Sequence, residues 1–293
     1  MFKGTGVAIV TPFNKDGSID YSSLEKLINY IISGGIDFIV ALGTTSEAVT
    51  LTHSEKQSVM KSVIEFTNGR VPIIMGVGGN NTAQVVDELN KTDFTGISGI
   101  LSVAPYYNKP NQKGIYAHFA EIAKNSPLPI ILYNVPGRTS SNINTDTCID
   151  LAYEFENIVA IKEASGDMGQ IMELLYNKPE DFTILSGDDA LTYPMMALGA
   201  EGVISVVANA YPTEFSKMVT LLNEQKDFAS AKKIHYSLLP FINLLFADGN
   251  PAGIKAALEI MEVMENNLRL PMVAANNNLY KLLENFIKNY KQV

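Results

Sequence analysis

The stretch Ile158-Val159-Ala160-Ile161-Lys162 is a short apolar run that ends in a lysine, and seven similar runs recur along the chain. The eight runs are rich in Val, Ile and Leu and cover residues 6–10, 38–42, 73–77, 99–103, 130–133, 158–162, 183–185 and 202–206. Each is too short for a core helix, and most are bounded by Gly, Pro or polar residues. Near-continuous apolar strands are typical of parallel sheets covered on both faces, so the pattern predicts a parallel sheet.

The segments between these runs carry apolar residues at helical spacing. Residues 21–33 place Leu24, Leu27 and Ile28 on one face after a candidate N-cap at Asp20. Similar helices are predicted at residues 53–66, 82–91, 113–124 and 145–153. Strand–helix units repeated in this way favour an α/β fold of the (β/α)₈ TIM barrel type. An open doubly wound sheet is the alternative, but no Gly-x-Gly-x-x-Gly loop follows the first strand to support it.

The pattern changes after the eighth strand. Four helical stretches follow, at residues 212–222, 228–246, 251–264 and 272–290, with no clear strand among them. A barrel normally ends with one helix, so the surplus indicates a separate unit. We therefore predict a catalytic barrel at residues 1–225 and a C-terminal helical subdomain at residues 226–293, packed on the barrel.

Composition limits the classes of function. The 293 residues are 46% apolar and 18% charged, which is enough for a sizeable core. A formal charge of −9 gives no electrostatic reason to bind nucleic acid or an anionic membrane. The one cysteine, Cys148, allows no internal disulfide and is interpreted as a structural thiol in a reducing compartment. The first apolar run is broken at Pro12, and no later run has membrane-spanning length, so we expect a soluble cytoplasmic protein.

Polar residues gather where the predicted strands end, which is where barrel enzymes carry their chemistry. The segments are Gly43-Thr44-Thr45-Ser46-Glu47, Pro105-Tyr106-Tyr107-Asn108, Tyr133-Asn134-Val135-Pro136-Gly137-Arg138, Lys162-Glu163-Ala164-Ser165 and Ser186-Gly187-Asp188-Asp189.

Lys162 is the sharpest candidate among them, because it directly follows four apolar residues of a strand. In an apolar environment an ammonium group loses its proton more readily, and the neutral amine can attack a ketone. The alternative is a lysine that reaches solvent or pairs with Glu163.

Three further groups could assist such an amine. The phenol of Tyr133 could transfer protons, or it could be a packing aromatic at the rim. Thr44 and Thr45 offer hydroxyls and backbone N–H groups for a carboxylate, although threonine pairs also occur in plain loops. Arg138 could bind a substrate carboxylate through two hydrogen bonds, or simply face solvent.

Other chemistries have less support in the sequence. The three histidines, His53, His118 and His235, fit no metal-ligand spacing, so we expect no metal. We expect no cofactor either. No Gly-x-Ser-x-Gly elbow or phosphate-binding Gly-Lys-Thr loop is present. Glu47 and Glu163 could form the carboxylate pair of a glycosidase, but a chain without tryptophan is poorly suited to stack sugars.

Taken in order, these motifs resemble the 4-hydroxy-tetrahydrodipicolinate synthases, formerly dihydrodipicolinate synthases, of the N-acetylneuraminate lyase family of class I pyruvate aldolases. The resemblance rests on Gly43-Thr44-Thr45-x-Glu47, Pro105-Tyr106-Tyr107-Asn108-Lys109-Pro110, Tyr133-Asn134-Val135-Pro136-Gly137-Arg138-Thr139 and Ile161-Lys162-Glu163-Ala164. It extends from Val7-Ala8-Ile9-Val10-Thr11-Pro12-Phe13 to Leu268-Arg269-Leu270-Pro271-Met272 and so covers essentially the whole chain.

The resemblance implies a reaction and a role for each residue. Lys162 forms an imine with pyruvate, and the resulting enamine attacks L-aspartate 4-semialdehyde in the diaminopimelate pathway to lysine. The implied proton relay is Thr44, Tyr133 and Tyr107, the last from a neighbouring subunit of a homotetramer built from two dimers.

The implied substrate-binding residues are Thr45 for the carboxylate of pyruvate, Arg138 for that of the semialdehyde, and Gly187 and Ile204 in the pocket. Arg138 favours the synthase, because sialic acid lyases usually lack an arginine here. Another pyruvate-dependent lyase acting on a sugar acid, and a barrel that only binds a 2-oxo acid, are the alternatives.

Two departures from the family pattern stand out. Ser46 replaces a glycine, so it must adopt ordinary backbone geometry or carry strain. The positions of the family's lysine-binding allosteric pocket correspond to Ala48, Val49, His53, Lys56, Asn80, Gln84 and Tyr106. Lys56 adds a cation and Gln84 removes an anion, which predicts weak or absent inhibition by L-lysine.

Overall fold

The structure is a computed structural model that describes residues 2–291. Its strands are β1 (Gly4–Ala8), β2 (Phe38–Ala41), β3 (Ile73–Gly76), β4 (Gly99–Val103), β5 (Ile130–Asn134), β6 (Ile158–Glu163), β7 (Thr183–Ser186) and β8 (Gly202–Ser205). They close into a barrel in sequence order, and neighbouring strands pair in parallel. The predicted TIM barrel is confirmed, and each strand lies within about two residues of the apolar run that indicated it.

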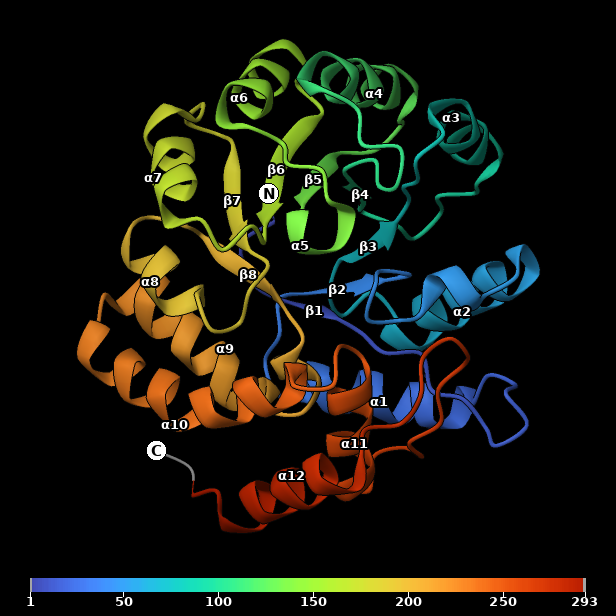
Figure 1. Ribbon diagram of the computed structural model, residues 1–293, viewed down its shortest axis with the longest axis vertical. Helices are drawn as coiled ribbons and strands as arrows, with labels where there is room; N and C mark the ends of the chain where they lie inside the picture. Colours follow the sequence, from blue (N-terminus) through green and yellow to red (C-terminus); the bar gives the residue numbers. More distant parts are fainter. Residues whose placement is uncertain (1, 292–293) are drawn as a thin grey trace. The chain divides into compact units, whose positions relative to one another are not determined.

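Helices separate the strands and continue after β8 (Figure 1). They are α1 (Tyr21–Ser33), α2 (His53–Thr67), α3 (Thr82–Lys91), α4 (Gln112–Asn125), α5 (Pro136–Thr139), α6 (Thr145–Glu154), α7 (Met168–Asn177), α8 (Thr192–Ala197), α9 (Pro212–Thr220), α10 (Phe228–Phe246), α11 (Ala252–Ile260) and α12 (Asn277–Asn289). Short turns of other helix types occur at Ala48–Thr50, Val207–Asn209 and Leu221–Gln225. The helices α5, α7 and α8 had not been predicted; α5 and α8 are too short to show a periodicity.

Local capping explains most helix ends. Asp20 accepts a hydrogen bond from the backbone N–H of Ser23, as predicted for the start of α1. The last two helices are shorter than predicted. The segment after α11 turns at Glu262, whose φ is 58°, and α12 begins only after Asn276 caps its first turn.

The chain divides into two compact units. Unit 1 is Ile73–Ile204 with Phe2 and Lys3, and unit 2 is Gly4–Pro72 with Ser205 onward. The predicted boundary between residues 225 and 226 stays a prediction.

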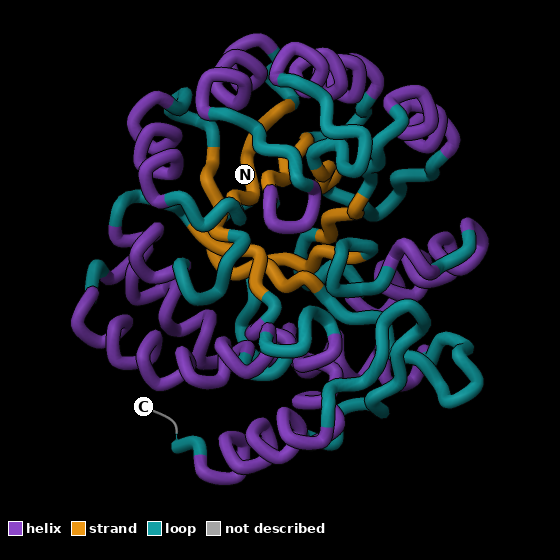
Figure 2. The backbone as a smooth tube through the Cα atoms, in the orientation of Figure 1, coloured by secondary structure: helices purple, strands orange, loops and turns teal. Residues whose placement is uncertain are grey.

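Within unit 1, the parallel strands β4 to β7 lie side by side, and the helices α3, α4, α6 and α7 pack one against the next (Figure 2). The strands are almost fully buried, with burial at every position of β5. This burial on both faces is why they appear in the sequence as continuous apolar runs rather than as an alternating pattern.

Within unit 2, the C-terminal helices form a packed group in which α10 contacts α9, α11 and α12. An aromatic cluster joins α10 and α12, with the rings of Phe241 and Phe286 stacked 5.2 Å apart and Tyr211 edge-on to Phe241 at 4.9 Å. Across residues 2–291, no helix combines the length and apolar character needed to cross a membrane.

Candidate active site

Lys162 lies near the C-terminal end of β6 with only 6% of its surface exposed. In the strand register it is opposite Tyr133 on β5 and Leu185 on β7. Its Nζ lies 4.3 Å from the centroid of the Tyr133 ring, and Tyr133 is itself buried. The structure therefore brings the predicted nucleophile and the predicted phenol into contact, with the amine over the face of the ring.

Gly187 makes room for the lysine side chain. A Cβ atom at this position would lie 3.0 Å from both Cγ and Cε of Lys162 and 2.7 Å from Cβ of Ala164. The backbone N–H of Gly187 also donates to the carbonyl of Glu163 at 2.7 Å. A side chain at this position would collide with Ala164 and crowd Lys162, so the glycine leaves the lysine its space. Ile204, the other predicted pocket residue, is buried in β8.

Glu163 lies in a network of neutral donors on the face opposite to Lys162, because successive side chains of a strand alternate between faces. Its carboxylate accepts from Asn134 Nδ2 at 2.9 Å, from the backbone N–H of Ser165 at 2.6 Å and from Gln170 Nε2 at 3.2 Å. Burial raises the pKa of Glu163, and these hydrogen bonds oppose that rise. The alternative in which Lys162 merely pairs with Glu163 is therefore wrong.

The same network shapes the loop that carries Arg138. Asn134, fully buried, donates to Oδ1 of Asn142 at 2.8 Å and accepts from the backbone N–H of Ile143 at 2.9 Å. Thr139 closes the turn by donating to the carbonyls of Val135 and Ser141. Arg138 lies on this loop in α5; it is exposed and forms no ion pair within residues 2–291. Its guanidinium is thus available to an anion.

Tyr107 occupies a strained position on an exposed loop. Its φ is 70°, a left-handed conformation that is uncommon for a bulky residue, and 89% of its surface is exposed. The neighbouring Asn108 donates from Nδ2 to the carbonyl of Asn80 at 2.9 Å, which holds the loop. Backbone strain of this kind concentrates at functional segments, which agrees with a role for Tyr107.

Residues 43–47, which we call the threonine loop, belong to unit 2. Thr44 is exposed, whereas Thr45 is buried and its Oγ1 accepts a hydrogen bond from Asn250 Nδ2 at 2.9 Å. Ser46 has an ordinary backbone conformation, and its hydroxyl donates to the carbonyl of Gly43 at 2.8 Å. Of the two geometries expected for a serine at this place, the unstrained one is therefore observed.

A buried ion-pair network follows directly after these threonines. Glu47, with a φ of 53°, forms an ion pair with Lys255 of α11 at 2.6 Å, and both side chains are almost completely buried. Lys255 Nζ also donates to the carbonyl of Asn267 at 2.9 Å and lies 4.2 Å from the centroid of the Phe13 ring. Burial lowers the pKa of Lys255 to about 8, although Glu47 opposes the shift.

Arg269 extends this network. Its backbone N–H donates to Glu47 Oε2 at 3.0 Å, and its guanidinium forms two hydrogen bonds with the carboxylate of Glu55. Arg269 holds the pKa of Glu55 down at about 2. We call Glu47, Lys255 and Arg269 the Glu47 clamp.

The residues that the family resemblance assigns to a lysine-binding pocket occur in both units, and each is described by its own element. His53 and Lys56 lie in the first turn of α2, and Gln84 lies in the first turn of α3. Asn80 precedes α3, and Tyr106 is about one-third exposed.

The other candidate groups have local structural explanations. Glu47 is bound by Lys255 and Glu163 by neutral donors, so neither is a free carboxylate of a glycosidase pair. His118 accepts or donates a hydrogen bond with Thr82 at 2.9 Å, and burial lowers its pKa to about 4. Cys148 is buried, which raises its pKa. Across the described residues 2–291, no three His, Cys, Asp or Glu side chains gather as a metal-binding group.

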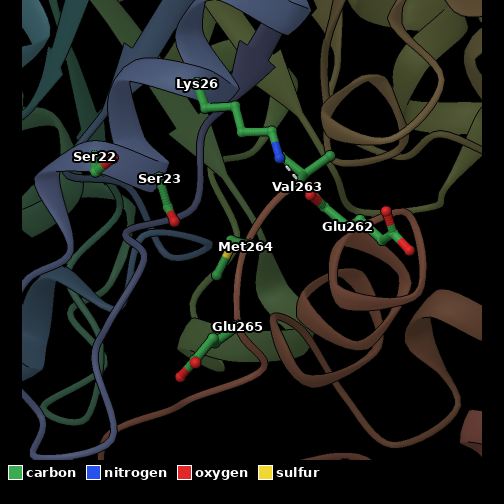
Figure 3. A pocket seen from close by; sticks show the side chains of 7 residues that line it. All are labelled: Ser22, Ser23, Lys26, Glu262, Val263, Met264 and Glu265. Atoms are coloured by element: carbon green, nitrogen blue, oxygen red, sulfur yellow. Dashed lines mark hydrogen bonds between the residues drawn. The ribbon is translucent and has the colours of Figure 1, made fainter.

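A separate pocket of about 340 Å³ lies in unit 2 (Figure 3). Its lining comes from the start of α1 and the segment after α11, and Lys26 spans it to donate to the carbonyl of Glu262. No predicted site residue lines it, and its two glutamates, Glu262 and Glu265, sit beside a single lysine.

A buried lysine beside a tyrosine at a strand end of a parallel barrel is the arrangement expected of a Schiff-base-forming lyase. Comparison with known proteins supports this class of enzyme and identifies a family within it. The model of the dihydrodipicolinate synthetase family matches residues 1–290, and the chain belongs to that family. It is 49% identical over 287 residues to the 4-hydroxy-tetrahydrodipicolinate synthase of Flavobacterium psychrophilum, covering 98% of each chain.

Solved structures agree with the sequence comparison. The dihydrodipicolinate synthase of Aquifex aeolicus superimposes with a TM-score of 0.95 at 41% identity, covering 99% of this chain and 98% of that one. The chloride-inhibited dihydrodipicolinate synthase of Acinetobacter baumannii, complexed with pyruvate, gives a TM-score of 0.95 at 40% identity and covers 98% of both chains.

Sequence reasoning missed the residues that support the predicted ones. Asn250, Lys255 and Arg269 bind the threonine loop from more than 200 positions away, and spacing carries no information over such a distance. One signal was present: Lys255 is a lone charge within the otherwise apolar start of α11, Ala252–Ile260. A charge on a buried helix face requires a partner.

Proposed function

We propose that this chain condenses pyruvate with L-aspartate 4-semialdehyde as a 4-hydroxy-tetrahydrodipicolinate synthase. Lys162 attacks the ketone of pyruvate, and loss of water gives an imine that tautomerises to an enamine. The enamine carbon attacks the aldehyde, and cyclisation releases the lysine amine with the heterocyclic product. The observation that carries the proposal is the buried Lys162 amine over the ring of Tyr133, next to Gly187, which leaves space for the lysine side chain.

The binding roles follow from chemistry and from family resemblance. Thr45 is proposed to hold the carboxylate of pyruvate, and Gly187 and the backbone carbonyl of Ile204 are proposed to line the pocket. Arg138 is proposed to recruit the carboxylate of the semialdehyde, and its lack of an ion partner within residues 2–291 supports this role. The named relatives support the synthase over a lyase that acts on a sugar acid.

The proton relay is proposed to consist of Tyr133, Thr44 and Tyr107. Tyr107 is almost fully exposed in a single chain, which supports its insertion into a neighbouring subunit. The assembly proposed is a homotetramer made of two dimers, and the proposed location is the cytoplasm.

Borohydride trapping tests the nucleophile. Reduction in the presence of pyruvate should leave a pyruvyl adduct on Lys162, identified by mass analysis of peptides. Lys255 is a demanding internal control, because it is also a buried lysine and its pKa is lowered to about 8. An adduct on Lys255, or an unmodified Lys162 in active protein, would refute the assignment.

Arg138→Ala separates the two substrates. This variant should still form the trapped pyruvate adduct, because Arg138 is assigned to the second substrate. Its turnover with aspartate semialdehyde should fall by roughly 100-fold or more, the scale of a lost charge-assisted contact in a transition state. Normal turnover in Arg138→Ala would contradict the assignment and reopen the choice of second substrate.

Regulation by L-lysine is proposed to be weak or absent. Lys56 places a cation in the first turn of α2, and the adjacent Glu55 is engaged with Arg269 rather than with Lys56. Gln84 supplies no anion for the ammonium of an effector. Gln84→Glu should therefore increase sensitivity to L-lysine, whereas strong inhibition of the unmodified protein at sub-millimolar L-lysine would overturn the proposal.

A further inference from the structure

We infer that Asn250, in the connection between α10 and α11, is a positioning residue that aims the Thr45 hydroxyl at the substrate carboxylate. This inference rests on the proposed role of Thr45. Both side chains are buried, with 6% and 3% of their surfaces exposed, and Asn250 Nδ2 lies 2.9 Å from Thr45 Oγ1. The contact joins residues separated by 205 positions in the chain.

The contact with Asn250 determines whether the Thr45 hydroxyl is free to donate a hydrogen bond. A threonine hydroxyl has one proton to donate and two lone pairs that accept. When Asn250 Nδ2 donates to the oxygen, one lone pair is occupied and the proton of Thr45 stays free. A carboxylate can only accept hydrogen bonds, so a hydroxyl held in this state is prepared to donate to it. The reverse orientation, with the amide oxygen towards Thr45, would consume that proton.

The segment that follows Asn250 is also attached to the threonine loop. Residues just beyond Asn250 enter α11, where Lys255 forms the buried ion pair with Glu47, two residues after Thr45. Asn250 and α11 therefore bind the threonine loop through two contacts: the neutral hydrogen bond to Thr45 and the ion pair with Glu47. Asn250 Oδ1 is buried and has no hydrogen-bond partner within residues 2–291, so the bond from Nδ2 to Thr45 is the polar contact that orients the amide.

Two substitutions of Asn250 change the hydrogen bonding of the Thr45 hydroxyl in different ways. Asn250→Ala removes the donor and frees the hydroxyl to rotate, which should raise the pyruvate concentration for half-maximal borohydride trapping roughly tenfold. Asn250→Asp keeps the shape but accepts the Thr45 proton and adds a negative charge, so the increase should approach roughly 100-fold. The KM for aspartate semialdehyde should change by less than about twofold in both variants, a split that general unfolding does not produce.

A double-mutant cycle with Thr45→Val tests whether Asn250 acts through Thr45. Once the hydroxyl is absent, Asn250→Ala should change pyruvate trapping by less than about twofold further. Asn267→Ala is the matched control, because Asn267 Nδ2 also donates across the fold, to the carbonyl of Phe13 at 2.9 Å. This control should lower the melting temperature without weakening pyruvate trapping.

The outcomes separate the inference from the proposed function. If Thr45→Val leaves pyruvate trapping unchanged, the role of Thr45 fails and the inference fails with it. If Thr45→Val weakens trapping but both Asn250 variants match the unmodified protein, the inference alone is overturned. Equal effects of Asn250→Ala with and without the Thr45→Val substitution would also overturn it, because they would show action by another route.

Discussion

Two buried glutamates, one in each compact unit, are stabilised in different ways. Glu163, next to Lys162 in the sequence, is fully buried and is held by the amides of Asn134 and Gln170 and a backbone N–H. Glu47, just after the threonine pair, is held by the ammonium of Lys255 and the backbone of Arg269. One carboxylate is stabilised by dipoles and the other by a full charge.

The two kinds of partner correspond to the different surroundings of Glu163 and Glu47. Because neutral groups bind Glu163, its carboxylate needs no cation close to Lys162. The alternation of side chains along the strand also keeps Lys162 and Glu163 on opposite faces. A carboxylate bound by Lys255 ties together segments far apart in the sequence, at the cost of burying two charges. The first arrangement suits the strand end that carries the proposed nucleophile, and the second suits the attachment of α11 to the threonine loop.

Breaking the charged arrangement should have the largest effect. Lys255→Met leaves Glu47 buried without its cation, which should cost about 3–5 kcal/mol and lower the melting temperature by roughly 6–10 °C. Thermal unfolding measures the loss. Lys288→Met, which removes an exposed Glu284 pair on α12, is the control and should cost less than about 1 kcal/mol. Equal decreases in melting temperature in the two variants would show that the buried pair stabilises the fold no more than the exposed one.

Breaking the neutral arrangement should cost less. Glu163→Gln keeps the shape but turns an NH₂ group towards donors, which should cost about 1–3 kcal/mol. Because no full charge is left unpaired, the shift in melting temperature should be smaller than that of Lys255→Met. Glu173→Gln on the exposed face of α7 provides the background value. A loss larger than that of Lys255→Met would reverse the comparison.

The acid limb of the stability curve tests the partly exposed end of the Glu47 clamp. Arg269 lowers the pKa of Glu55 from 4.5 to about 2, so this carboxylate stabilises the folded state above pH 4.5. The contribution should disappear as the pH falls from about 4.5 to 2. Because Glu55 and Arg269 are partly exposed, we expect about 1–2 kcal/mol after screening.

Glu55→Gln should therefore lower stability at pH 7 and lose less between pH 5 and pH 3 than the unmodified protein. Parallel acid-induced losses in the two proteins would contradict the assigned pKa shift.

The smallest effect is expected at Cys148, which lies in α6 on the Glu163 side of the sheet. Burial, with a further contribution from the charge of Glu163, raises the pKa of its thiol and withholds the reactive thiolate. The folded protein should resist thiol reagents and keep its activity, and labelling should require unfolding. Rapid labelling with loss of activity would show that this region opens readily.

Much of the barrel and the candidate site could be predicted locally. The apolar runs indicated each strand because a strand buried on both faces admits few polar residues. Lys162 and Tyr133 were identified because each lies at a strand end, and the structure places the Lys162 amine over the Tyr133 ring. Gly187 was identified through the family resemblance, and a Cβ atom there would crowd Lys162. The roles of all the predicted site residues, Lys162 and Tyr133 included, stay predictions.

The sequence by itself determined the strands, the polar segments at their ends and the family, because these depend on short segments and their spacing. Only the tertiary structure decided which partners hold those segments. Amides donate to Glu163, and Lys255 and Arg269 bind Glu47. Asn250 donates to Thr45, which lies 205 positions away in the sequence. Such pairings depend on how strands and helices pack, and a buried polar group can be satisfied by any suitable partner that the fold brings near it.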